Sequence, residues 1–273
     1  MTMHANDAVC PKMTAQIKDR LAALAAEENI LILLAVESGS RAWGFHSTDS
    51  DYDVRFIYAR PIPWHLGLTK KRDVVERPID NELDLSGWDL GKALCLALQS
   101  NAVIAEWLQS PICYAAYPGA HDDLTTFTRN VLTRRPIMWH YLSMVRRQQE
   151  RLVEADGSIR LKRFFYTLRP ALALRWIRMN DAAMPPMDMA SLLAGCDLKP
   201  ADTQAILDLI EMKKQLMEKT QTGAVPTVLS DLVMDEVDTA RIYLDGGARS
   251  KPDARNYQTA GALNLKYANQ AGA

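Results

Sequence analysis

The sequence lacks an excess of charge of either sign and any long apolar segment. Its Lys and Arg residues number 32 and its Asp and Glu residues 33, so the formal net charge is −1. No overall electrostatic field therefore attracts the chain to nucleic acid. No apolar run approaches the roughly 18 residues of a membrane-spanning helix. We expect no membrane association, and a hydrophobic content of 48% is ample for a buried core.

Cysteine is also scarce, and its four positions form no recognisable pattern. The chain contains no Cys-x-x-Cys pair and no paired histidines at metal-binding spacing. No secretory signal peptide is recognisable at the start of the sequence. These absences predict a cytoplasmic protein without structural zinc or disulfides.

Two strand-like segments flank a Gly-Ser turn. Residues 30–34 form an apolar run with the length of a buried strand, and residues 51–58 form a second strand-like segment. Gly39 and Ser40 lie between them. Glycine lets the backbone approach a ligand closely, and clustered backbone N–H groups bind anions. The turn at Gly39 and Ser40 therefore predicts a phosphate-binding loop. Arg41 follows directly, either as an added positive charge for the phosphates or as an exposed structural arginine.

Two aspartates open the second strand-like segment. Asp51 and Asp53 are two residues apart, so their side chains face the same side of a strand. Such carboxylates repel each other, and a divalent cation removes this repulsion. Mg²⁺ prefers one or two carboxylates together with phosphate oxygens of a substrate. The aspartate pair and the adjoining turn predict a metal-assisted phosphoryl-transfer site.

This stretch resembles the signature of the DNA polymerase β-like nucleotidyltransferase superfamily, which is Gly-Ser, a following Gly (here Gly44), and then Ser-Asp-x-Asp (here 50–53). A closer resemblance, to the RNA-ligase-associated polymerase-like subfamily, extends through residues 87–90, 106–111 and 166–170. The resemblance implies an α+β fold, in which a small mixed β-sheet domain like the polymerase β palm precedes an α-helical domain. It also implies that the nucleotide lies in the cleft between them.

The resemblance implies a third metal-binding carboxylate, for which Asp84 and Asp89 are the candidates. Leu83 and Leu85 flank Asp84 in a strand-like segment, so its side chain would point away from the core. The superfamily takes its third carboxylate from such a strand. Residues 86–89 instead look like a helix start, where Asp89 would stabilise the first turn. We favour Asp84 and keep Asp89 as the alternative.

Helical periodicity extends from about residue 120 to residue 244, and small polar residues follow. We predict a nucleotidyltransferase catalytic domain over residues 1–118, an α-helical domain over 119–245, and a loosely attached C-terminal extension over 246–273.

Charge is divided within the helical region. Residues 129–178 are rich in Lys and Arg, whereas residues 181–238 are rich in Asp and Glu. One interpretation is that these helices attract each other. The other is that the basic block binds triphosphate or a nucleic-acid backbone. In the second interpretation Lys162, Tyr166 and Arg169, which fall on one face of a helix, contact the nucleotide together with the Gly39–Arg41 loop.

The predicted chemistry is nucleotidyl transfer. Asp51, Asp53 and Asp84 are the expected catalytic carboxylates and ligands of two Mg²⁺ or Mn²⁺ ions, with a nucleoside triphosphate as the substrate. Subfamily analogy favours an RNA end as the acceptor, in template-independent RNA repair or processing. The alternatives are nucleotidylation of a protein or small molecule, such as AMPylation, and a non-catalytic nucleotide-binding regulator or antitoxin-like partner. Nothing in the sequence indicates a particular protein partner.

Overall fold

The computed structural model describes residues 9–69, 71–80, 82–152, 159–216, 225–246 and 252–273. The chain forms two compact units. The first comprises residues 1–42, 51–132 and 251–273, and the second comprises residues 43–50 and 133–250. A mixed sheet lies in the first unit and helices make up the second, which confirms the predicted α+β class.

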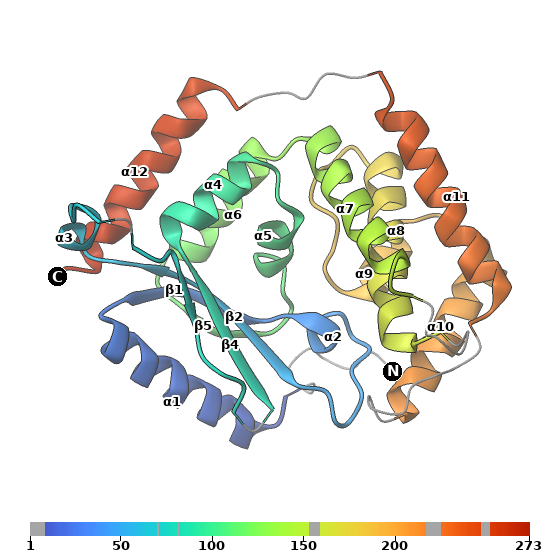
Figure 1. The fold of residues 1–273 in the computed structure, drawn as a ribbon, viewed down its shortest axis with the longest axis horizontal. Coiled ribbons are helices and arrows are strands. Elements are labelled where there is room, and N and C mark those ends of the chain that lie inside the picture. The colour runs from blue at the N-terminus through green and yellow to red at the C-terminus, as the bar shows by residue number, and fades with distance from the viewer. Residues whose placement is uncertain (1–8, 70, 81, 153–158, 217–224, 247–251) are drawn as a thin grey trace. The chain divides into compact units, whose positions relative to one another are not determined.

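A five-stranded sheet organises the first unit, in the order β3-β4-β2-β1-β5 (Figure 1). Its strands are β1 (Leu31–Glu37), β2 (Tyr52–Ala59), β3 (Val74–Glu76), β4 (Leu83–Asp89) and β5 (Cys113–Ala116). β2 and β4 are parallel, and the other neighbouring strands are antiparallel. The sheet is therefore mixed, and β2 and β4 are its parallel pair.

Helix α1 (Pro11–Glu28) covers one face of this sheet (Figure 1). Its apolar residues recur at helical spacing and pack against alternate side chains of β2 and β4. The shared core includes Ile17, Leu21, Leu24, Val54, Phe56, Leu83 and Leu85. Because successive strand residues point to opposite faces, the residues between these apolar positions point away from α1.

Six further helices lie in the described part of the first unit. They are α2 (Gly39–Ala42), α3 (Ile62–His65), α4 (Leu90–Leu98), α5 (Ala102–Trp107), α6 (Ala120–Val131) and α12 (Ala254–Gln270). Helix α4 packs on β2 and β4 from the side opposite α1 (Figure 1). Since α6 also lies in this unit, the first unit extends beyond the predicted boundary at residue 118.

The C-terminal helix α12 corrects the prediction of a loosely attached extension. It packs against α4 and α6. Tyr267 is fully buried, and its hydroxyl donates a hydrogen bond of 2.7 Å to the Asp123 carboxylate on α6. Lys266 forms an ion pair with the same carboxylate. An apolar ring with a satisfied hydroxyl thus anchors a segment whose composition is polar overall.

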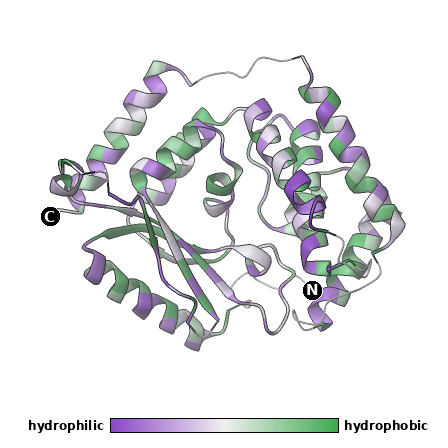
Figure 2. Cartoon of the chain, in the orientation of Figure 1, coloured by the Kyte–Doolittle hydropathy of each residue, from purple (hydrophilic) through white to green (hydrophobic). Residues whose placement is uncertain are grey.

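The second unit consists of helices around α8. They are α7 (Arg134–Gln149), α8 (Leu161–Met179), α9 (Met189–Ala194), α10 (Pro200–Gln215) and α11 (Thr227–Leu244). Hydrophobic and hydrophilic residues alternate along these helices (Figure 2). The short segment 43–50 joins this unit through aromatic contacts, since the rings of Phe45 and Phe165 stack with centroids 4.5 Å apart. None of the helices in the described ranges has the length and apolar character needed to cross a membrane.

Candidate active site

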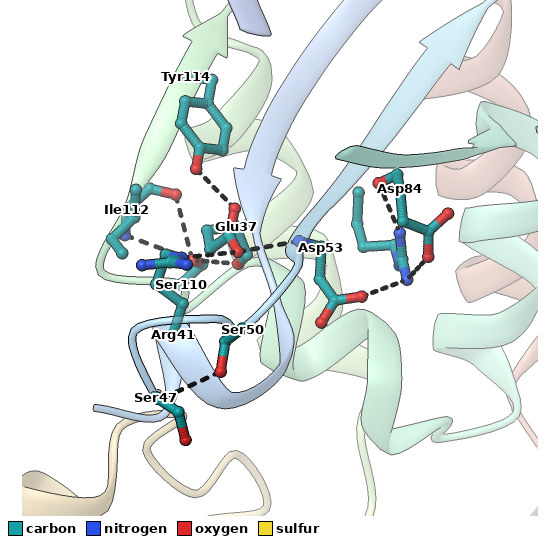
Figure 3. A network of polar contacts seen from close by, with 10 residues as sticks. Glu37, Arg41, Ser47, Ser50, Asp53, Asp84, Ser110, Ile112 and Tyr114 are labelled. Carbon is teal, nitrogen blue, oxygen red and sulfur yellow. Dashed lines mark hydrogen bonds and ion pairs between the residues drawn. The ribbon is translucent and has the colours of Figure 1, made fainter. Parts of the chain in front are cut away.

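Two aspartates meet on the face of the sheet that points away from α1. β2 and β4 run parallel in a register that places Asp53 beside Asp84. The two carboxylates turn toward the same guanidinium (Figure 3). Arg55 Nη2 lies 2.9 Å from Asp53 Oδ1 and 2.7 Å from Asp84 Oδ2. Both aspartate side chains keep 28% of their surface exposed, so the pair is reachable from solvent.

The glycine of the predicted phosphate loop lies directly against this pair. Gly39 has φ +61°, and a Cβ atom at this position would lie 2.1 Å from Asp53 Oδ2. The Ser38 N–H donates a 2.8 Å hydrogen bond to the Asp53 carbonyl oxygen. Only glycine combines the left-handed backbone with this close approach. The loop is therefore fastened to β2 at the aspartate, and Ser40 follows as the next residue of α2.

A buried carboxyl group that the sequence analysis did not select lies behind Asp53. Glu37 is fully buried and accepts hydrogen bonds from the Tyr114 hydroxyl at 2.6 Å and from the Asp53 backbone N–H at 3.0 Å (Figure 3). Desolvation by burial raises the pKa of Glu37 to about 7, against the opposing effect of these hydrogen bonds. Burial and the neighbouring Glu37 also raise the pKa of Tyr114. Glu37 thus fixes the backbone at the residue that carries one carboxylate of the pair.

Arg41 lies within the same part of the first unit. Its Nε is 3.8 Å from Glu37 Oε1, and its guanidinium lies over the Tyr52 ring at 4.0 Å from the centroid. The side chain is only 5% exposed. In this position Arg41 supports the strand ends that carry the aspartates, and a direct contact with phosphate stays a prediction.

The two alternatives for the third carboxylate occupy different ends of β4. Asp84 lies beside Asp53, whereas Asp89 lies beside Tyr58 in the same register. Asp89 caps α4, where its Oδ1 accepts a 2.9 Å hydrogen bond from the Gly91 N–H. Burial raises its pKa. The capping interpretation of Asp89 is confirmed.

Asp51 does not join the pair in a closed cluster. It is exposed and precedes the first residue of β2. Within the described ranges, no group of three or more His, Cys, Asp or Glu side chains is arranged to hold a metal ion. The structure thus brings Asp53 and Asp84 together, and the part that Asp51 plays stays a prediction.

The predicted nucleotide-binding face of α8 is not a uniform exposed surface. Arg169 is fully buried, with its Nε donating a 3.0 Å hydrogen bond to the Met187 carbonyl and its guanidinium 4.9 Å from the centroid of the Trp43 ring. The Tyr166 ring meets Trp43 edge-on at 4.8 Å, and Lys162 is half-buried. Arg169 therefore does not share an exposed face with Lys162, because packing turns its side chain inward, and nucleotide binding by this side of α8 stays a prediction.

Three residues of this site were not predicted from the sequence, and they differ in how clearly the local sequence indicates them. Arg55 follows Asp53 by two positions, so the alternation that grouped the aspartates also places it on their face. Glu37 ends an apolar strand, where a carboxyl group is unexpected. Tyr114 carried no local signal, since its partner Glu37 is 77 positions away in the chain.

A mixed sheet with carboxylates on adjacent strands, beside a glycine that touches one of them, is the arrangement expected of a polymerase β-like nucleotidyltransferase. The chain belongs to the RlaP family, described as the RNA repair pathway DNA polymerase beta family, whose sequence profile matches residues 13–258. The predicted resemblance to this superfamily and subfamily is confirmed. At this general level the protein is a nucleotidyltransferase-like member of the polymerase β superfamily.

Two similar proteins accompany this match. The chain is 35% identical over 226 residues to the uncharacterized protein YcgL of Bacillus subtilis (strain 168), across 83% of this chain and 86% of that protein. A crystal structure of a nucleotidyltransferase-like protein from Exiguobacterium sibiricum 255-15 aligns with 92% of this chain and 79% of its own, at 14% identity and a TM-score of 0.29. A TM-score this low carries no structural argument, so the assignment to the family depends on the sequence match.

Proposed function

We propose that this protein transfers a nucleoside monophosphate from a nucleoside triphosphate to an acceptor hydroxyl, with an RNA end as the favoured acceptor. The observation that carries the proposal is the convergence of Asp53 and Asp84 on one cationic nitrogen, directly beside Gly39. Neighbouring carboxylates next to a close-approach glycine suit the joint binding of a divalent cation and a phosphate chain.

The carboxylate pair fits a divalent cation. Its two oxygen atoms already share a single positively charged partner, so their positions suit a common cation. Asp53 and Asp84 would hold Mg²⁺ or Mn²⁺, with Asp51 at the edge of the same strand as the proposed third ligand for two ions. When bound, such ions neutralise the triphosphate and the charge that develops on the leaving group.

The residues of the chain have separate roles in the proposed reaction. Gly39 leaves room for phosphate oxygens near the backbone, and the Ser40 hydroxyl is the proposed donor to them. The acceptor hydroxyl oxygen forms a bond to the α-phosphorus while the bond from that phosphorus to the β-phosphate oxygen breaks. Pyrophosphate leaves, and the hydroxyl proton passes to a carboxylate, for which an aspartate of the site is the economical choice.

The acceptor is argued from the family. Its description names RNA repair, and this favours an RNA end over a protein or small-molecule hydroxyl. Because one fold serves many acceptors, this part of the proposal depends on analogy with the family and is tested separately from the chemistry.

The test is a transfer assay with each α-labelled nucleoside triphosphate, Mg²⁺ or Mn²⁺, and RNA, DNA or protein as the acceptor. We expect label on RNA and release of pyrophosphate. Label on protein with none on RNA would overturn the acceptor and retain nucleotidyl transfer. Label on no acceptor, with nucleotide still bound, would favour a non-catalytic regulator. Asp53→Asn and Asp84→Asn serve as inactive controls, and Asp89→Asn serves as the matched active control.

A further inference from the structure

The carboxylate pair of the proposed site is already bridged by a side chain of the protein. Arg55 Nη2 donates to both Asp53 and Asp84, as given above, and Arg55 Nη1 donates to the backbone carbonyl oxygens of Val54 at 3.2 Å and Asp84 at 3.1 Å. The guanidinium therefore contacts both carboxylates and is held by four oxygen atoms.

This contact has the charge and geometry of an internal counter-ion. Two carboxylates on neighbouring strands repel each other, and a guanidinium presents parallel N–H groups that suit carboxylate oxygens. Only 18% of the Arg55 side chain is exposed, so solvent screens the attraction less than at an open surface. Arg55 thus supplies the positive charge that keeps Asp53 and Asp84 together without a metal ion.

A divalent cation and the guanidinium compete for the same oxygens. A cation held by the Asp53 and Asp84 carboxylates would compete for the two acceptors that Arg55 Nη2 now uses. Two cations this close also repel each other. The Arg55 side chain has room to move, because a cavity of about 550 Å³ opens beside it, lined by Asp84, Ser86 and Arg77 among others.

We propose that Arg55 is an exchangeable counter-ion, which holds Asp53 and Asp84 in the metal-free protein, is displaced by the divalent cation and thereby sets the metal affinity of the site. This inference rests on the proposed function, since it assigns the aspartate pair to a metal ion. It makes Arg55 a positioning residue. Its removal tightens metal binding and at the same time weakens the metal-free fold.

The experiment measures Mn²⁺ binding without nucleotide, by loss of the free-ion paramagnetic resonance signal, and the melting temperature in EDTA. Arg55→Met removes the charge and keeps much of the side-chain length. Arg55→Lys keeps the charge without the planar fork. Arg77→Met is the matched control, because Arg77 lines the same cavity but pairs with Glu27 and Glu28.

We expect Arg55→Met to bind Mn²⁺ about tenfold more tightly than the unaltered protein, which corresponds to about 1.4 kcal/mol. Its melting temperature in EDTA falls, and saturating Mn²⁺ raises it more than in the unaltered protein. Arg55→Lys tightens binding by a smaller factor, and Arg77→Met leaves the Mn²⁺ affinity unchanged. If Arg55→Met does not fold, tighter binding by Arg55→Lys carries the test.

An Mn²⁺ affinity that stays equal or weakens in both Arg55 variants overturns the exchange, and makes Arg55 a purely structural residue. If the unaltered protein nevertheless transfers nucleotide, the proposed function survives this result. Absence of Mn²⁺ binding in every variant, together with absence of transfer, overturns the metal site and the exchange together.

Discussion

Charged side chains serve different purposes in the two units of this protein. In the first unit, Asp53, Arg55 and Asp84 meet on the sheet with part of their surface exposed. In the second unit, Arg175 and Arg178 both bind Glu236, which is only 3% exposed, and so tie α8 to α11. The interpretation that the basic and acidic helices attract each other is confirmed for these residues. Charged side chains thus form the proposed ligand site in one unit and connect helices in the other.

The largest effect is expected at the aspartate pair. Asp53→Asn or Asp84→Asn should reduce nucleotide transfer by more than about a hundredfold, because even residues behind metal ligands commonly contribute 10–100-fold. Asp89→Asn should retain transfer, since the amide oxygen can still cap α4. Initial rates of pyrophosphate release provide the measurement.

A cost in stability accompanies the first of these substitutions. Asp53→Asn removes one ion pair of Arg55 and also the charge repulsion with Asp51. We expect the loss of the ion pair to dominate, so the free energy of unfolding in EDTA should fall by up to about 1 kcal/mol. Full activity in Asp84→Asn together with loss in Asp89→Asn would reverse the assignment of the third carboxylate.

The next effect concerns the phosphate loop. Ser40→Ala removes a hydroxyl that we assign to the triphosphate, where a hydrogen bond to a charged group contributes about 1.5–3 kcal/mol. We expect a tenfold to hundredfold loss of catalytic efficiency, smaller than for the aspartates. Steady-state kinetics with varied nucleoside triphosphate measure it. Unchanged efficiency would leave the loop as a structural turn beside Asp53.

A third prediction tests whether a buried charged residue of the second unit serves stability rather than nucleotide binding. Arg169→Met leaves the buried Met187 carbonyl without its donor, so we expect a loss of about 1–3 kcal/mol in the free energy of unfolding. Nucleotide affinity of the folded variant should not change. Lys162→Met on the same helix is the matched comparison and should alter stability less, because Lys162 is only half-buried.

Denaturant unfolding and equilibrium nucleotide binding distinguish the two arginine roles. Loss of nucleotide affinity in a stably folded Arg169 variant would show that charge in the second unit also contributes to ligand binding. Affinity lost in Lys162→Met alone would narrow the predicted nucleotide-binding face of α8 to its exposed part.

The remaining prediction concerns the pH dependence of stability. The pKa of Glu37 is raised from 4.5 to about 7 by burial. The unfolded chain therefore releases this proton at a lower pH than the folded chain does, and stability falls as pH rises between these two values, then levels off. Glu37→Gln removes this titration. In EDTA, the free energy of unfolding of the unaltered protein should decline relative to the variant across this window, and parallel curves would show that Glu37 does not titrate there.

Local patterns predicted the elements that need only a few neighbouring residues. The strand-like segment 51–58 anticipated β2 within a residue at each end. Gly39 does turn the chain after β1 with a left-handed backbone, but Gly39–Ala42 forms the short helix α2 rather than a loop. The short strand β5 was not predicted, since Cys113–Ala116 pairs with β1 across a long chain separation and has no pattern of its own.

Local sequence patterns were enough to indicate the central strand segments, the position of the turn at Gly39 and the carboxylates that are candidates for the site. Tertiary structure decided which of them meet, because the register of β2 against β4 brings Asp53 to Asp84 and leaves Asp89 at the far end. It also decided that Arg169 is buried and that α12 is anchored. The physical reason is that strand register and helix rotation are fixed by burial against segments distant in the chain, which no local spacing encodes.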